Sequence, residues 1–146
     1  MSPLLNYSTR VPADKTANEI VSLLGRKGAT AVMMEFDAGE VGSLSWQVKT
    51  PHGELPFRLP ANIAAVRKVL ERQGVGRKDP QEALDQARRV AWRILKTWVM
   101  AQMALLETEM VTLDQLFLPY LCTGGGATLY DYMVGTGFKQ LAAGSP

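Results

Sequence analysis

The stretch DPQEALDQARRVAWRILKTWVMAQMALLETEM, residues 79–110, decides the fold class of this chain. Asp79 is a good N-cap residue, Pro80 occupies the first helical position and Glu82 the third, and together they mark a strong helix start. No glycine or further proline interrupts the rest of the stretch. We therefore predict one continuous helix over Gln81–Met110, about 45 Å long at a rise of 1.5 Å per residue.

The two halves of this predicted helix differ in pattern. In the first half, apolar residues form one stripe and charged residues form the opposite one. The apolar stripe is Leu84, Ala87, Ala91, Ile94 and Leu95, and the charged stripe is Asp85, Arg89, Arg93 and Lys96. From Trp98 to Leu106, apolar residues cover nearly the whole circumference. Because such a helix must be covered on all sides, this half is either the centre of the core or an oligomer interface.

Three segments before the long helix have the pattern of β-strands. Leu44–Thr50 alternates between apolar and polar residues, as expected for a sheet with one buried and one wet face. Ala29–Phe36 and Leu55–Leu59 flank it, and turn-forming residues separate all three segments. We predict an antiparallel meander.

Shorter elements complete the prediction. We expect an extended segment at Leu4–Val11, a short helix opened by the capping-box spacing Thr16–Glu19, and further helices at 62–71, 113–121 and 128–135. The predicted fold class is α+β, with a small antiparallel sheet of three to four strands packed against one long central helix and shorter helices around it. Residues 1–140 form a single domain in this prediction, and residues 141–146 form a frayed tail.

Composition narrows the classes of function. With 47% hydrophobic and 21% charged residues, the 146-residue chain has the make-up of a globular domain. Cys122 is the only cysteine and His52 the only histidine, which excludes an internal disulfide and a Cys/His zinc site. No signal peptide or membrane span is visible. We expect a cytoplasmic protein without catalytic residues, metal, cofactor or membrane contact.

Positive charge is concentrated in one part of the chain. Residues 58–96 contain ten Lys or Arg and four acids, a local balance of +6 within a chain whose net charge is +2. Such segregation is typical of a surface that binds an acidic partner, and also of a helix face that is merely solvated. The candidate nucleic-acid-binding residues are Arg67, Lys68, Arg72, Arg77, Lys78, Arg88, Arg89, Trp92, Arg93 and Lys96.

Aromatic residues matter here because unpaired bases stack on them. Trp46 and Trp98 fall on apolar faces and are predicted to lie in the core. Trp92 stands next to Arg93 at the edge of the basic face, so we expect it to be partly exposed and available for stacking.

A metal-dependent nuclease is one alternative. Asp37 at a strand end, followed by Gln47 and Lys49 on the next strand, resembles the core of PD-(D/E)xK nucleases. Gln47 departs from that pattern because it supplies no negative charge. Magnesium would then rest on Asp37 with Glu35 or Glu54.

Three stretches in order along the chain resemble a family of small uncharacterised proteins encoded by phages, prophages and mobile elements. They are VPADKT with EI (11–16, 19–20), PFRLP (56–60), and RVAWRILK (89–96) running on to FLP (117–119). The resemblance implies an accessory protein with no established catalytic residues. The order of helix, sheet and long helix is also distantly similar to that of phage single-strand annealing proteins.

The interpretation we favour is a non-enzymatic accessory protein that binds nucleic acid, with single-stranded DNA among the candidates, through its basic helix face. The other alternative is a protein-interaction or oligomeric module, such as an inhibitor of a host factor. In that case the contact would be the apolar helix half 98–106, and the partner a second copy or a protein of the host or phage.

Overall fold

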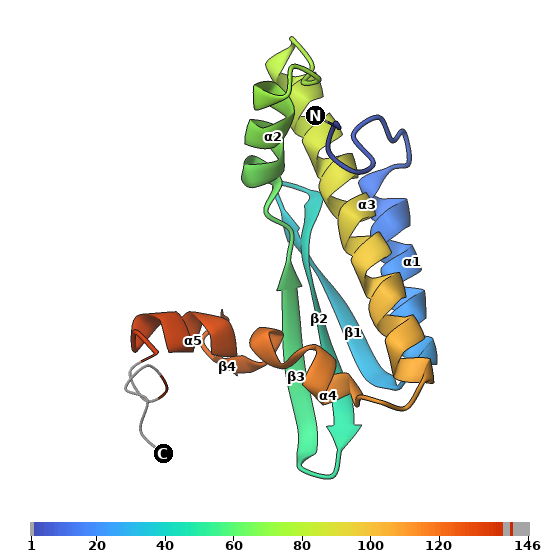
Figure 1. Ribbon diagram of the computed structural model, residues 1–146, viewed down its shortest axis with the longest axis vertical. Helices are drawn as coiled ribbons and strands as arrows, with labels where there is room; N and C mark the ends of the chain where they lie inside the picture. The colour runs from blue at the N-terminus through green and yellow to red at the C-terminus, as the bar shows by residue number, and fades with distance from the viewer. Residues whose placement is uncertain (1, 139–140, 142–146) are drawn as a thin grey trace.

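The computed structural model describes residues 2–138 and 141, and these form an α+β fold (Figure 1). The chain runs through α1 (Ala13–Arg26), β1 (Ala29–Asp37), β2 (Glu40–Thr50), β3 (Gly53–Pro60), α2 (Ile63–Arg72), α3 (Pro80–Glu107), α4 (Leu113–Leu116), the 3-10 turn η1 (Leu118–Tyr120), β4 (Cys122–Gly124), β5 (Ala127–Thr128) and α5 (Leu129–Gly135). The predicted tail at 141–146 lies outside the described residues, except for Leu141.

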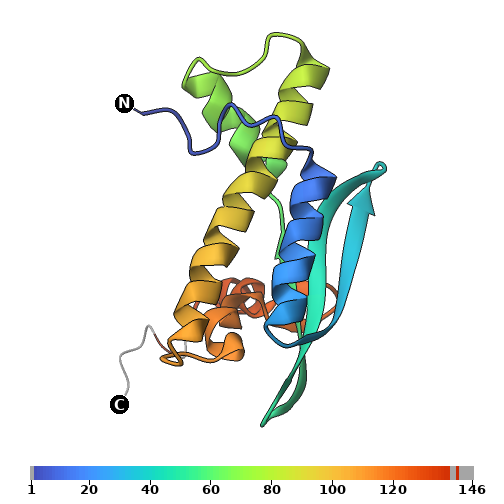
Figure 2. The ribbon, with the colours of Figure 1, turned by 90° about the vertical axis from the view of Figure 1, so that its right-hand side faces the viewer.

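Strands β1, β2 and β3 form an antiparallel sheet in that order, as predicted. The helices α1 and α3 lie side by side on one face of it (Figures 1 and 2). Leu44, Trp46 and Val48 of the central strand point into this layer and are buried, which confirms the face predicted from alternation. Within the described residues no fourth strand joins this sheet, and β4 and β5 pair with each other instead.

Two hydrophobic clusters hold the elements together. The larger one joins the sheet to α1 and to α3, which contributes Trp92, Val99 and Met103. The smaller one lies between α2 and the first half of α3, and Leu4 of the N-terminal segment packs against it. The prediction of an extended segment over Leu4–Val11 is wrong, because residues 5–8 within it form a turn, in which the Tyr7 amide donates to the Leu4 carbonyl at 3.0 Å.

The long helix α3 is continuous, as predicted. Asp79 accepts from the Glu82 amide at 3.0 Å, and Pro80 stands at the helix start. The helix ends three residues before the predicted Met110, since Glu109 adopts a φ of +62° that no α-helix accommodates. Its second half belongs mostly to the core, because Val99 and Met103 are buried, yet the side that carries Met100 is exposed.

Two predicted helix boundaries are wrong for physical reasons. Thr16 does not cap α1 but lies buried inside it, and the helix begins one turn earlier, at Ala13, which is also buried. The predicted helix 113–121 stops after one turn and continues as η1, because Pro119 has no amide to donate. From η1 the chain reaches the edge of β3, where Phe57 and Leu121 form an isolated bridge. None of the helices in the described residues is long and apolar enough to cross a membrane.

Candidate nucleic-acid interface

The fold divides the predicted basic residues into two groups. Arg88, Arg89, Arg93 and Lys96 lie on the first half of α3, and we call them the α3 cations. The others lie on α2 and on the loop between α2 and α3, and they are Arg67, Lys68, Arg72, Arg77 and Lys78. The two groups differ in what surrounds them.

Two of the α3 cations bind the same carboxylate of α1. Arg93 Nη1 donates to Glu19 Oε2 at 3.1 Å, and Lys96 Nζ donates to the same oxygen. The side chains of Arg93 and Lys96 are only 27% and 19% exposed. The hydrogen bond from Lys96, its charge and the contact from Arg93 hold the pKa of Glu19 below its usual range, so the acid stays ionised. These two cations therefore tie α1 to α3.

The other two α3 cations are also engaged within the molecule. Arg88 pairs with Asp85 at 3.2 Å, and its side chain is only 13% exposed. Arg89 donates to Gln86 Oε1 from Nε at 2.9 Å and from Nη2 at 2.6 Å. Gln86 is buried and in turn donates to the carbonyls of Tyr7 and Thr9, which fixes the N-terminal segment on α3. Arg93 and Lys96 thus link α3 to α1, whereas Arg88 and Arg89 are engaged by neighbouring residues of α3 itself.

Trp92 is fully buried, so the prediction of a partly exposed stacking residue is wrong. Its Nε1 donates to the Val41 carbonyl at 3.2 Å, which satisfies the indole inside the core. The signal that identifies it is spacing: Val99 follows seven residues later and Met103 four after that, so all three share the core stripe of α3.

Four cations in the C-terminal half of α2 and on the loop that follows it are exposed, and we call them the basic tip. They are Lys68 and Arg72 on the last turns of α2, and Arg77 and Lys78 on the following loop. None of the four has a salt bridge to any residue that the structure describes. Arg67 is different, since its Nε lies 3.3 Å from Glu71 Oε1. The helix α2 and the loop after it, which carry the basic tip, lie at one end of the molecule, beyond the sheet (Figures 1 and 2).

The loop that carries Arg77 and Lys78 is hydrogen-bonded to the end of α2. Gly74 turns the chain with a φ of +72°, a conformation that glycine adopts without strain. The amides of Val75 and Gly76 then both donate to the Leu70 carbonyl at 3.1 Å. Val75 packs against the smaller hydrophobic cluster. The chain directly before the two cations is therefore held in place, which lowers the conformational entropy that is lost when a ligand binds there.

The residues predicted for a nuclease site do not meet. In the strand register Asp37 pairs with Glu40, whereas Lys49 pairs with Glu54 at the other end of the sheet. The nine residue steps along β2 from Glu40 to Lys49 span about 30 Å at a rise of about 3.3 Å per residue. No group of three or more His, Cys, Asp or Glu suited to a metal ion occurs in the described part of the chain.

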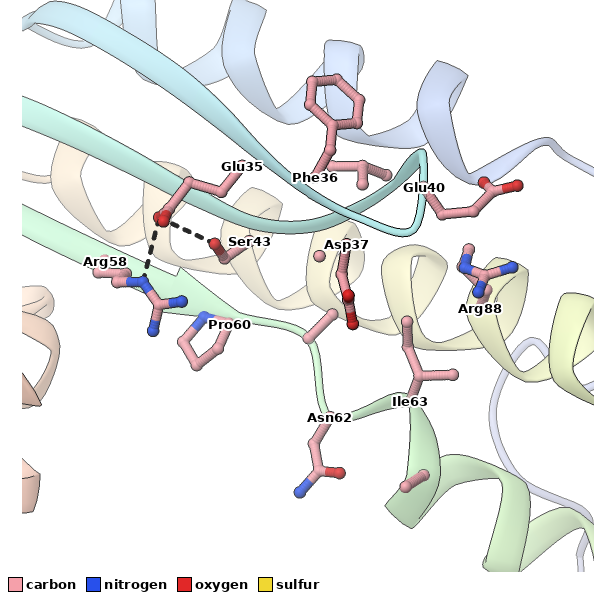
Figure 3. A pocket seen from close by; sticks show the side chains of 14 residues that line it. Glu35, Phe36, Asp37, Glu40, Ser43, Arg58, Pro60, Asn62, Ile63 and Arg88 are labelled. Atoms are coloured by element: carbon pink, nitrogen blue, oxygen red, sulfur yellow. Dashed lines mark hydrogen bonds and ion pairs between the residues drawn. The ribbon is translucent and has the colours of Figure 1, made fainter. Parts of the chain in front are cut away.

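Glu35, which with Glu54 was one of two alternatives for the second magnesium ligand, belongs to a polar network on the open face of the sheet. Its Oε1 accepts from Ser45 at 2.8 Å, from Ser43 at 2.9 Å and from Arg58 Nε at 3.1 Å. The hydrogen bonds from Ser45, Ser43 and Arg58 lower the pKa of Glu35. The network lines one side of an open pocket of about 650 Å³ next to the β1–β2 turn (Figure 3).

Exposed apolar side chains gather in two other places. Met33 and Phe36 lie on β1, and Tyr130, Tyr132 and Val134 lie on α5, which buries none of its residues. The predicted interface at 98–106 contributes little to this surface, because most of its large side chains belong to the core.

No protein-family model, curated protein or solved structure gives a significant match to this chain.

Proposed function

We propose that this chain is a non-enzymatic nucleic-acid-binding protein that contacts backbone phosphates through the basic tip. The observation that carries the proposal is the state of four side chains, Lys68, Arg72, Arg77 and Lys78, which are exposed and have no salt bridge among the described residues. A phosphate that binds there replaces only water, whereas at the α3 cations it must first displace an acid or an amide oxygen.

The sequence resemblance to phage and mobile-element proteins is consistent with this proposal, and it suggests an accessory role in the cytoplasm. Contacts to phosphate carry no sequence information directly. The proposal is therefore one of binding without strong sequence preference, unless another surface adds contacts to base edges.

A salt series tests the proposal. Each neutralised phosphate releases condensed counterions, so four contacts predict that log K falls against log salt with a slope of about −3.6 for duplex DNA and about −2.8 for single strands. The affinity for duplex should then drop roughly 150-fold between about 50 and about 200 mM salt. The measurement is fluorescence anisotropy with labelled single- and double-stranded oligonucleotides. Absence of binding at low salt, or an affinity that salt leaves unchanged, would end the proposal.

A further inference from the structure

The sheet has one protected edge and one open edge. The outer strand β3 carries Pro56 and Pro60, which lack amides, and Leu121 bridges to it at Phe57. The strand β1 lies at the other edge, and within the described residues no strand pairs with its outer side (Figure 2). Its unpaired backbone groups are a template for another strand.

The middle of the open edge lacks the features that usually prevent strands from pairing there, since the irregularities of β1 lie near its two ends. Natural proteins block such edges with lysine, proline or inward-pointing charge, yet residues 29–37 contain neither Lys, Arg nor Pro. The strand has two acids: Asp37 is its last residue, and the carboxylate of Glu35 is held over the sheet by Ser43, Ser45 and Arg58, of which Figure 3 shows Ser43 and Arg58. Exposed instead are Met33 at 58% and Phe36 at 64%.

The core-facing side of β1 is also incompletely covered. Val32 and Met34 pack against the larger hydrophobic cluster but are only half-buried. Leu44 and Trp46, which oppose them on β2, are buried. A strand added beside β1 would cover Val32 and Met34 from their open side and remove further apolar area from water.

The register of β1 indicates which strand would fit. Irregularities between Ala29 and Ala31 and between Glu35 and Phe36 enclose one regular segment, Ala31–Glu35, with Met33 at its middle. An antiparallel copy of this segment places Met33 opposite itself, Val32 opposite the partner's Met34, and Ala31 opposite the partner's Glu35. Apolar side chains then meet on both faces, and no like charges oppose each other.

We propose that β1 pairs with β1 of a second copy of this chain, antiparallel and about a two-fold axis at Met33, to form a continuous six-stranded sheet. The contact is isologous, so it closes as a dimer and does not propagate into a filament. It is separate from the basic tip and does not rest on nucleic-acid binding.

Charge substitution at Met33 tests the pairing by light scattering. The native chain should have the mass of a dimer, and Met33→Lys and Met33→Glu should each give a monomer, because two like charges then face each other across the axis. An equimolar mixture of the two variants should restore the dimer mass. Gln47→Lys is the matched control, since Gln47 is exposed on the same face of the sheet but on the central strand, and it should remain a dimer.

A cross-link measures the same contact without new charge. In a Cys122→Ser background, Met33→Cys should form a disulfide-linked dimer on oxidation, because directly opposed Cα atoms lie about 4.5–5.5 Å apart, within disulfide range. Gln47→Cys in that background should not. A monomeric native chain at about 100 µM, a dimer that survives Met33→Lys, or a mixture of charge variants that stays monomeric would each overturn the proposal. If the Met33→Lys variant remained a dimer, the interface would lie elsewhere, such as on α5.

Discussion

The α3 cations and the basic tip each consist of four lysines and arginines, yet among the described residues only the α3 cations form salt bridges or hydrogen bonds to acids and amide oxygens. Glu19 of α1 binds Arg93 and Lys96, whereas no described residue forms a salt bridge to the basic tip. A count of lysines and arginines thus does not separate cations that are paired within the fold from cations that are exposed and form no described salt bridge. The two groups differ in which element packs beside them: α1 places Glu19 next to Arg93 and Lys96.

This difference has an energetic consequence. Releasing a half-buried cation from its carboxylate leaves a charge with poor solvation, which offsets the gain from a phosphate. An exposed cation on a fixed loop has no such cost. We therefore expect substitutions at the basic tip to change binding and substitutions around the α3 cations to change stability.

The largest expected effect is on binding by the basic tip. In the triple variant R72Q/R77Q/K78Q, affinity for a duplex oligonucleotide at low salt should fall on the order of 100-fold, and the slope of log K against log salt should shrink by about 2.7. The midpoint of urea unfolding should change little, because these side chains are exposed and have no described salt bridge.

A control for net charge comes from three exposed cations on other parts of the molecule. The variant K15Q/R26Q/K49Q removes the same charge from α1 and from the far end of the sheet. It should keep most of the affinity and of the salt slope. Equal losses in the two triple variants would mean that overall charge, and not the basic tip, governs binding.

A smaller effect is expected on stability when the acid that binds two α3 cations is removed. Glu19→Gln keeps the shape of the side chain but leaves Arg93 and Lys96 without a counter-charge, which should lower the free energy of unfolding by about 1 kcal/mol for this half-buried group. Affinity for nucleic acid should not fall. Glu40→Gln is the control, because Glu40 is exposed and forms no described salt bridge.

The interaction of Glu19 with Arg93 and Lys96 also predicts how stability changes with pH. The pKa of Glu19 is lowered in the folded state from the ordinary value of 4.5, mainly by the hydrogen bond from Lys96. Its stabilising contribution is then complete above about pH 4.5 and is lost as the pH falls through the folded-state pKa. The difference in unfolding free energy between the native chain and Glu19→Gln should shrink below pH 4.5. A difference that stays constant there would contradict the assignment.

Local signals carried much of the fold prediction. The N-cap Asp79 with Pro80 fixed the start of α3, and the alternation over Leu44–Thr50 identified the buried face of β2. These predictions succeeded because capping and periodicity depend on residues a few positions apart. Thr16 shows the limit of such signals: its capping-box spacing was outweighed by burial of the preceding turn, where Ala13 belongs to the larger hydrophobic cluster.

The surroundings of the predicted site residues are set by contacts between residues far apart in the sequence, which no local pattern reveals. Glu19 lies 74 residues from Arg93 and 77 from Lys96 in sequence, so their pairing follows only from the packing of α1 on α3. The Val41 carbonyl that accepts from Trp92 is 51 residues away. The sequence therefore identified the cations but could not show which of them are paired within the fold. The prediction for Trp92 was wrong because it relied on the adjacent Arg93, whose side chain is partly exposed whereas that of Trp92 is buried.

The smallest expected effect comes from removing the acid that pairs with Arg67, the cation of α2 that lies beside the basic tip in sequence. Glu71→Gln releases Arg67, whose salt bridge to Glu71 is partly exposed, so stability should change by less than about 0.5 kcal/mol. If pairing is what keeps Arg67 from phosphate, the salt slope should steepen by about 0.9. Glu82→Gln removes the same charge nearby without releasing a cation, so it should steepen the slope less. Equal slopes in the two variants would show that local charge, and not the release of Arg67, sets the number of phosphates bound.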